Sequence, residues 1–257
     1  MQAFYKLCCC VFLLFLSLSL QAKTVAGLPR YLNQEITVDE VAKIVTKGIS
    51  SDKKKAEALA VFVASYYERD GFLEKEKLNA FRKGKVYQKE YGNNFFYSRV
   101  GDSKDFALLY QALCSAVGLK AVVVEGYAGK NVYAYGAVRP EQQIVRMTSS
   151  LLTGKKDISL ERYRSWWNAL EIKGKWILVD TYWMIRSEKS AYKNISSAKK
   201  MAKKLAQNEK RPLRPVNNSV DKSFFDAKPK DFIKTHFPFE EKWQLIKPPV
   251  SLSRFLK

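Results

Sequence analysis

One stretch, residues 99–127, constrains the fold of this chain more than any other. Apolar residues recur in it at intervals of three and four, which predicts a helix with one buried face: Phe106, Leu109, Tyr110, Leu113, Cys114 and Val117. Asp102 and Ser103 would begin this helix, and Gly118 would follow its end, where a left-handed backbone is favoured. The apolar run Ala121–Val124 then predicts a buried strand.

Ser103 stands at the predicted N-terminus of this helix. The helix dipole favours negative charge there, so many enzymes place a nucleophile at such a position. Serine is also a favourable N-cap residue, because its hydroxyl accepts a backbone N–H of the first turn. We therefore interpret Ser103 as an N-cap and keep a catalytic role for it as the alternative.

The first residues read as a targeting segment. Lys6 is followed by an apolar run, Leu7–Leu20, of the length typical of a signal peptide and too short to span a bilayer comfortably. Cleavage after Ala22 or after Ala26 fits this reading, and an uncleaved membrane anchor is the alternative. The sequence therefore predicts an exported protein, periplasmic or extracellular.

The cysteines exclude two classes of site. Cys8, Cys9 and Cys10 would leave with the signal peptide, so Cys114 would be alone in the mature chain. An intramolecular disulfide and a cysteine metal cluster are then ruled out. Because Cys114 lies on the apolar face of its helix, we predict that it is a core residue.

The formal net charge is +20, which attracts anionic surfaces at long range, although basicity can also serve solubility alone. A predicted amphipathic helix within residues 195–206 carries four lysines opposite its apolar face: Lys199, Lys200, Lys203 and Lys204. Such a helix can bind an anionic membrane or polymer. The alternative is a surface helix that packs by its apolar stripe and keeps its lysines in water.

Further elements are predicted before the Ser103 helix. Thr37 and Glu40 form the pattern of a capping box in front of an amphipathic helix. A second helix would begin at Ser51 or Asp52. Residues 95–100 are expected to form a short strand or an extended lead-in.

After the strand near residue 124, weak alternation predicts another strand at residues 131–138. Two clear strands follow, Trp167–Ile172 and Lys175–Thr181, joined by the tight turn Lys173-Gly174. The aromatic and proline-rich tail, residues 224–257, is expected to fold back onto the core.

Three strings in the chain carry a family resemblance: GDSKDFALLYQALCSAVGLKAVVVEGYA from Gly101, SWWNALEIKGKWILVDTYW from Ser165, and the tail with HFPFEEKWQL from His236. Together they resemble the transglutaminase-like superfamily, in its kyphoscoliosis-peptidase-like branch, over about residues 37–255. The resemblance implies an α+β fold similar to papain-like enzymes, with helices packed on an antiparallel sheet. Together with the targeting pattern and the basic segment, this resemblance gives the predicted organisation: a signal peptide at 1–22, an extended lead-in at 23–36 and one domain at 37–257, with a basic helical insertion at about 187–221.

That family uses a Cys–His–Asp triad, and the resemblance places its three positions on this chain. The cysteine position is Ser103, the histidine position is Ser165, and the aspartate is retained as Asp180. Trp166 also replaces a small residue of the family pattern. A serine hydroxyl is not ionised as a thiol is and needs a general base, which Ser165 does not supply. Asp180 would then be left with no imidazole to orient.

These losses predict a catalytically inactive domain that acts by binding a protein, an anionic polymer or a membrane surface, without specific nucleic-acid recognition, metal or cofactor. Candidate contact residues are Trp166 and Trp167 beside the cleft, and the four lysines at 199, 200, 203 and 204. The alternative is an active peptidase or acyltransferase in which Ser103 uses a non-standard base. Because His236 is the only histidine, a relocated Ser103–His236–Asp180 triad is the form that this alternative takes.

Overall fold

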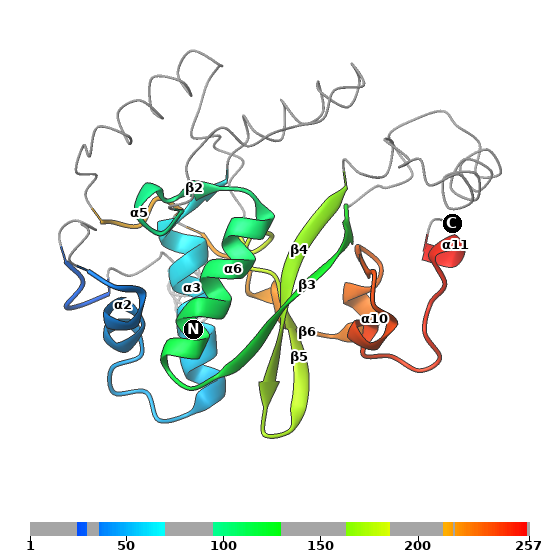
Figure 1. Ribbon diagram of the computed structural model, residues 1–257, viewed down its shortest axis with the longest axis horizontal. Coiled ribbons are helices and arrows are strands. Elements are labelled where there is room, and N and C mark those ends of the chain that lie inside the picture. Colours follow the sequence, from blue (N-terminus) through cyan, green and yellow to red (C-terminus); the bar gives the residue numbers. More distant parts are fainter. Residues whose placement is uncertain are drawn as a thin grey trace, which may run out of the picture.

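A five-stranded antiparallel sheet separates two groups of helices (Figure 1). The computed structural model describes residues 25–29, 36–69, 95–129, 163–185, 213–217 and 219–255. Helices α2, α3 and α6 lie on one side of the sheet, and the C-terminal helices α10 and α11 lie on the other. This arrangement confirms the predicted α+β class, with helices packed on an antiparallel sheet.

The first helices begin where the sequence predicts. Helix α2 (Val38–Val45) follows a complete capping box, in which Thr37 Oγ1 accepts from Glu40 N and the Glu40 carboxylate accepts from Thr37 N. Helix α3 (Asp52–Tyr66) begins directly after Ser51. Helix α6 (Ser103–Ala116) is followed by Gly118 with a φ of +76°, the left-handed conformation expected there.

Residues 95–100 differ from the strand or extended lead-in that the sequence suggested. They form a single helical turn, α5 (Phe95–Ser98), before the short strand β2 (Val100–Gly101), which pairs in parallel with β1 (Glu68–Arg69). The Phe95 ring lies 4.8 Å from the Tyr67 ring and 4.9 Å from the Phe106 ring, centroid to centroid. Packing of this aromatic side chain in the core therefore outweighs the weak local preference for an extended chain.

The large sheet has the strand order β6-β5-β4-β3-β7. Its strands are β3 (Lys120–Ala128), β4 (Arg164–Ile172), β5 (Lys175–Val179), β6 (Phe225–Ala227) and β7 (His236–Pro238). Strands β4 and β5 form the predicted hairpin. Gly126 of β3 allows the close approach of β7, because a Cβ there would lie 2.1 Å from Phe237 O.

The two faces of the sheet line two separate cores. Leu170 and Val179 pack with the helices α2, α3 and α6, whereas Trp167, Ala169 and Leu178 pack on the opposite face with residues of the tail. Alternation along β4 therefore divides its side chains between the two cores. Burial on both faces explains why the sequences of the two hairpin strands are almost continuously apolar.

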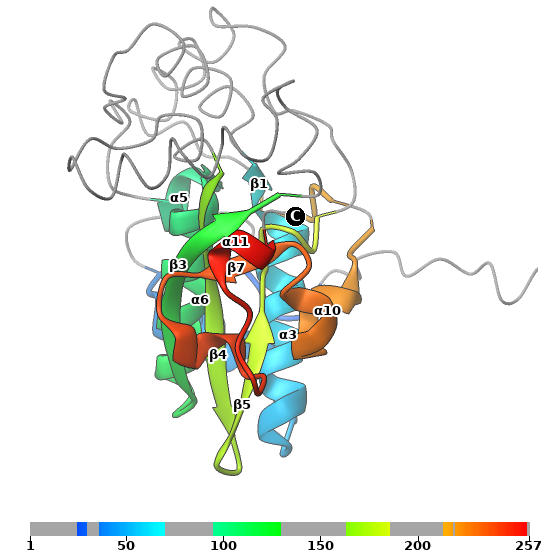
Figure 2. The ribbon, with the colours of Figure 1, turned by 90° about the vertical axis from the view of Figure 1, so that its right-hand side faces the viewer.

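The tail folds back onto the core, as predicted. After the 3-10 turn η1 (Lys222–Phe224) come β6, helix α10 (Pro229–Phe232), β7, the 3-10 turn η2 (Glu241–Gln244) and helix α11 (Leu252–Phe255). Figure 2 shows α10 and α11 in front of the sheet. Gln244 holds the last turn in place, because its side-chain amide donates to Val250 O and accepts from Val250 N.

Several predictions lie outside the described residues: the signal segment at 1–22, the strand at 131–138 and the lysine-rich helix within 195–206. Residues 213–217, at the end of the proposed insertion, lie against α3. The Asn217 side-chain amide there donates to Ala64 O and Tyr67 O. In the described segments, no helix is both long and apolar enough to cross a membrane.

The N-cap of α6 is Asp102, so the interpretation of Ser103 as the N-cap was wrong. Asp102 Oδ1 accepts from Lys104 N at 3.0 Å and from Asp105 N at 3.2 Å, and Asp105 Oδ2 accepts from Asp102 N at 3.0 Å. Two carboxylates three residues apart can satisfy each other's backbone N–H groups, which a serine at position 103 could not arrange. The hydroxyl of Ser103 is therefore left for another contact.

Replacing Asp102 with Ala should lower the free energy of unfolding by about 1 kcal/mol, because the helix start loses its acceptor. Asp102→Asn keeps an acceptor oxygen and should retain most of the stability. Urea unfolding of both variants measures the difference. A loss in Asp102→Asn as large as that in Asp102→Ala would contradict a capping role.

Candidate functional site

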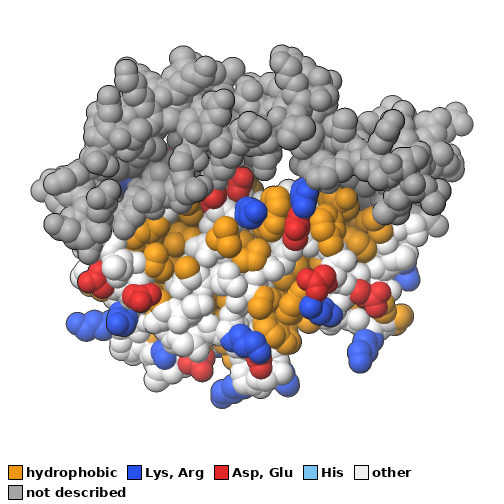
Figure 3. Space-filling view, in the orientation of Figure 1, with side chains coloured by type: hydrophobic (Ala, Val, Ile, Leu, Met, Phe, Trp, Pro, Cys, Tyr) orange, Lys and Arg blue, Asp and Glu red, His pale blue; other side chains and the backbone are white. Residues whose placement is uncertain are grey.

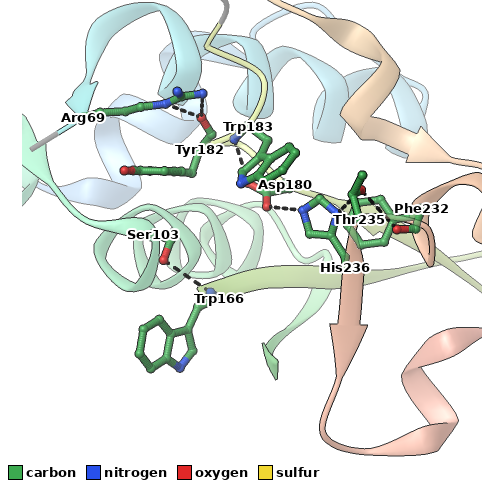
Figure 4. A network of polar contacts seen from close by, with 9 residues as sticks. All are labelled: Arg69, Ser103, Trp166, Asp180, Tyr182, Trp183, Phe232, Thr235 and His236. Carbon is green, nitrogen blue, oxygen red and sulfur yellow. Dashed lines mark hydrogen bonds and ion pairs between the residues drawn. The ribbon is translucent and has the colours of Figure 1, made fainter. Parts of the chain in front are cut away.

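Ser103 is the first residue of α6, and its hydroxyl contacts the hairpin. Ser103 Oγ accepts a hydrogen bond from Trp166 N at 3.3 Å, as Figure 4 shows. The side chain is largely enclosed, with 7% of the residue exposed. The helix start is therefore joined directly to β4 at the peptide that links residues 165 and 166.

Ser165 lies on this same peptide, so the structure brings positions 103 and 165 together. Ser165 is 6% exposed and is paired with Gly126 of β3. Strand alternation places its side chain on the same face as Trp167. That face is the one on which Asp180 and His236 meet.

Asp180 follows β5 and is fully buried. Its Oδ2 lies 3.0 Å from His236 Nε2, and its Oδ1 accepts from Trp183 N at 2.9 Å (Figure 4). Because a carboxylate only accepts hydrogen bonds, Nε2 is the donor of the first contact. The expectation that Asp180 would have no imidazole to orient was therefore wrong.

The His236 side chain forms hydrogen bonds and packs against several aromatic rings. Its Nδ1 lies 2.8 Å from Thr235 Oγ1, and its ring is stacked on Phe232 with a centroid distance of 3.9 Å. The ring of Trp183 lies 4.6 Å away and that of Trp167 lies 5.2 Å away, both approximately edge-on. The imidazole is fully buried, so neither of its nitrogens faces solvent. Each nitrogen has a partner within the protein, Asp180 for Nε2 and Thr235 for Nδ1.

The hydrogen bond between Asp180 and His236 requires the sheet to be strongly curved. Strand β7 is separated from β5 by β4 and β3. At about 4.8 Å per strand, a flat sheet would hold β5 and β7 about 14 Å apart. The side chains of Asp180 and His236 could not bridge that span. The hydrogen bond between them therefore shows that the sheet is strongly curved at this end.

The two candidate tryptophans have different environments. Trp166 is partly exposed, with Lys104 Nζ 5.5 Å and the Arg164 guanidinium carbon 5.6 Å from its ring centroid. Trp167 is buried in the core, so the expectation that it contacts a partner does not hold. The four lysines at 199, 200, 203 and 204 lie outside the described residues.

Comparison with known proteins decides the family of this fold and site. Residues 39–181 match the model of the family described as the transglutaminase-like superfamily, which is more than half of the chain. The chain belongs to the transglutaminase-like superfamily. The match spans residues 103, 165 and 180, the positions that the sequence resemblance assigns to the triad.

The similar curated proteins are much longer than this transglutaminase-like chain. It is 29% identical to hillarin of Drosophila melanogaster over 153 residues, which are 60% of this chain and 15% of hillarin. It is 23% identical to the kyphoscoliosis peptidase of Mus musculus over 219 residues, 85% of this chain and 26% of that protein. The human kyphoscoliosis peptidase is also 23% identical, over 93% of this chain and 29% of its own length.

Among the described residues, no side-chain base forms a hydrogen bond with Ser103 Oγ, whose contact is with the backbone N–H of Trp166. Both nitrogens of His236 are engaged, by Asp180 and by Thr235, and neither is directed at Ser103. Figure 4 shows the Ser103–Trp166 contact and the Asp180–His236 contact as separate parts of the network. The relocated triad therefore has its acid–imidazole link but lacks the link from imidazole to hydroxyl that general-base catalysis requires.

No group of three metal-ligating side chains occurs in the described part of the chain. Cys114 is fully buried, as predicted, and burial raises the pKa of its thiol to about 12. A thiolate is the reactive form of cysteine, so Cys114 is a core residue and not a nucleophile.

Sequence reasoning paired Asp180 with His236 only within the alternative of a relocated triad, and it did not anticipate the contacts that Thr235 and the backbone N–H of Trp183 make with this pair. One signal was available in the chain. A carboxylate at the end of a buried strand needs partners for its charge, and a lone histidine beside aromatic residues can supply one. The backbone N–H of Trp183 could not have been identified, because its direction depends on the turn at residues 180–184.

A double-mutant cycle should detect the buried pair. Asp180→Ala and His236→Ala should each destabilise the fold by about 3 kcal/mol, because each leaves a buried polar partner unsatisfied. The double variant should be more stable than the two losses predict, by a coupling of about 1–3 kcal/mol. Urea unfolding measures all four proteins.

The control cycle uses Lys222 and Glu57, whose side chains are paired at 2.7 Å and half exposed. Water screens such a pair, so its coupling should lie within about 0–1 kcal/mol. Equal coupling in the two cycles would show that the Asp180–His236 contact contributes nothing beyond an ordinary surface ion pair.

Proposed function

We propose that this protein is a catalytically inactive transglutaminase-like domain that acts by binding another molecule. The observation that carries the proposal is the pairing of Asp180 with His236. It commits the triad's acid and the chain's only histidine to each other in the core, while Ser103 and Ser165 occupy the two other positions.

Three physical arguments support inactivity. A serine nucleophile needs a base within hydrogen-bond reach, and Ser103 Oγ instead accepts from the backbone N–H of Trp166. That hydrogen bond occupies a lone pair of the oxygen and does not remove its proton. Ser103 is also only 7% exposed, so access to its hydroxyl is restricted.

Export is part of the proposal. It is supported by the Lys6 and Leu7–Leu20 pattern of the first 22 residues. Outside the cytoplasm, a protein with a net charge of +20 would encounter acidic proteins, anionic polymers and membrane surfaces, and its binding partner is proposed to be one of these.

The purified protein should show no turnover in amidase, peptidase and protein cross-linking assays. Ser103→Ala is the matched control, because it removes the only hydroxyl at the nucleophile position and leaves the Asp180–His236 pair intact. Turnover in the wild type that disappears in Ser103→Ala would refute inactivity. Turnover that persists unchanged in Ser103→Ala would come from a contaminant or from a different site.

Restoring the family's two missing groups tests whether the site is decayed but intact in geometry. In Ser103→Cys/Ser165→His, the imidazole should raise the thiolate fraction, and iodoacetamide should react with Cys at 103 about tenfold faster at pH 6 than in Ser103→Cys alone. Ser103→Cys/Ser165→Gln is the control without a base. Peptide mapping by mass spectrometry separates this thiol from Cys114. Equal rates in all three variants would contradict the juxtaposition of positions 103 and 165.

A further inference from the structure

The surface beside Ser103 carries a continuous series of apolar and cationic side chains. Lys104 Nζ lies 5.5 Å from the Trp166 ring centroid, and the Arg164 guanidinium carbon lies 5.6 Å from the same centroid and 5.9 Å from that of Phe239. The Phe239 ring lies 4.8 Å from the Tyr127 ring, edge to face. These contacts join α6, β4, β3 and the segment directly after β7 into one surface.

The pleat of the sheet puts these side chains on one face. Asn168 Nδ2 donates to Ala107 O, so the even-numbered residues of β4 face helix α6. Arg164 and Trp166 share this face by alternation, and their partners in register on β3 are Tyr127 and Glu125. Figure 3 shows hydrophobic and charged side chains interspersed over the N-terminal end of α6 and the nearby ends of β3 and β4.

Two large apolar residues of this surface are unusually exposed. Leu108 is 47% exposed and Phe239 is 45% exposed. Leu108 lies one helical turn after Lys104, so the two project from the same side of α6. We name the set Leu108, Lys104, Trp166, Arg164, Phe239 and Tyr127 the Trp166 surface. Tryptophan, tyrosine and arginine are the residues that contribute most to protein interfaces.

The charges on this surface differ in how they are satisfied. Glu125 is paired with Arg164, and the carboxylates of Asp102 and Asp105 are both bound by backbone N–H groups of the α6 capping box. Lys104 is exposed, and no described carboxylate pairs with it. Among the described residues, Lys104 is therefore a cation without a carboxylate partner, and it lies beside the Trp166 ring.

We propose that the Trp166 surface binds an acidic segment of a partner protein, in which a carboxylate is flanked by apolar or aromatic side chains. This inference rests on the proposed binding function and names the site and the class of partner. The partner's carboxylate pairs with Lys104, and its apolar side chains cover Leu108 and Phe239. The net charge of +20 steers such a segment toward the protein.

Two other macromolecules fit this surface less well. A membrane-binding face needs adjoining apolar residues, whereas Leu108 and Phe239 are separated here by Lys104 and Arg164. A single-stranded nucleic acid needs a free aromatic face on which a base can stack. Two cations already lie near the ring of Trp166, which leaves it poorly suited to stacking.

Panning a phage library of random 12-residue peptides against the purified protein tests the proposal. Enriched peptides should contain Asp or Glu next to Phe, Leu or Trp. Their affinity, measured by fluorescence anisotropy, should fall at least tenfold in Lys104→Glu and in Leu108→Ala/Phe239→Ala. The matched control is Lys54→Glu, which makes the same charge change at an exposed position of α3 and should alter affinity less than twofold. Circular dichroism checks that each variant is folded.

The other possible results separate failure of the binding proposal from failure of the proposed inactivity. Enriched peptides without acidic residues, or peptides that bind all variants equally, would overturn the proposal. So would failure to enrich any peptide when phosphatidylglycerol vesicles or a 20-nucleotide thymidine oligonucleotide bind in a Lys104-dependent manner. Ser103-dependent turnover would overturn the proposed inactivity instead, whatever the peptides show, so the two failures are distinguishable.

Discussion

The hydrogen bond between Asp180 and His236 is the interaction on which the arrangement of this domain depends. It joins the end of the β4–β5 hairpin to the tail strand β7 across two intervening strands. A buried carboxylate is costly unless it is paired, so the hairpin can bury Asp180 only if the tail is in place. In the same way, His236 can be buried among Phe232, Trp167 and Trp183 only if Asp180 accepts a hydrogen bond from its Nε2–H group.

This dependence gives a physical reason why the three triad positions differ. In the described part of the chain, Ser103 Oγ accepts a hydrogen bond from Trp166 N, and Ser165 is paired through its strand. Serine at either position is compatible with the fold, because neither side chain is a buried charge that needs a partner from a distant element, as Asp180 does. Asp180 does join them, so its loss would unfold the hairpin end as well as remove an acid. The fold therefore tolerates serine at residues 103 and 165, whereas it depends on Asp180 for stability.

The fold was predictable wherever a local pattern and a tertiary contact agree. The capping box at Thr37, the stripe of α6 and the Lys173-Gly174 hairpin are local signals that the packing reinforces. The turn α5 was not predictable, because the burial of Phe95 depends on rings that are remote in sequence. The cap of α6 was misplaced by one residue, since serine and aspartate compete as N-caps and the reciprocal bond from Asp105 decides between them. The Asp180–His236 bond depends on sheet curvature, which no local pattern records.

Trp166 belongs both to the surroundings of Ser103 and to the proposed Trp166 surface. Its backbone N–H contacts Ser103 Oγ, and its ring is turned outward near Lys104 and Arg164. A small residue at this position would leave the backbone bond possible but would remove the ring that brings the two cations together. Trp166 therefore contacts Ser103 through its backbone and, through its ring, forms the centre of the proposed Trp166 surface.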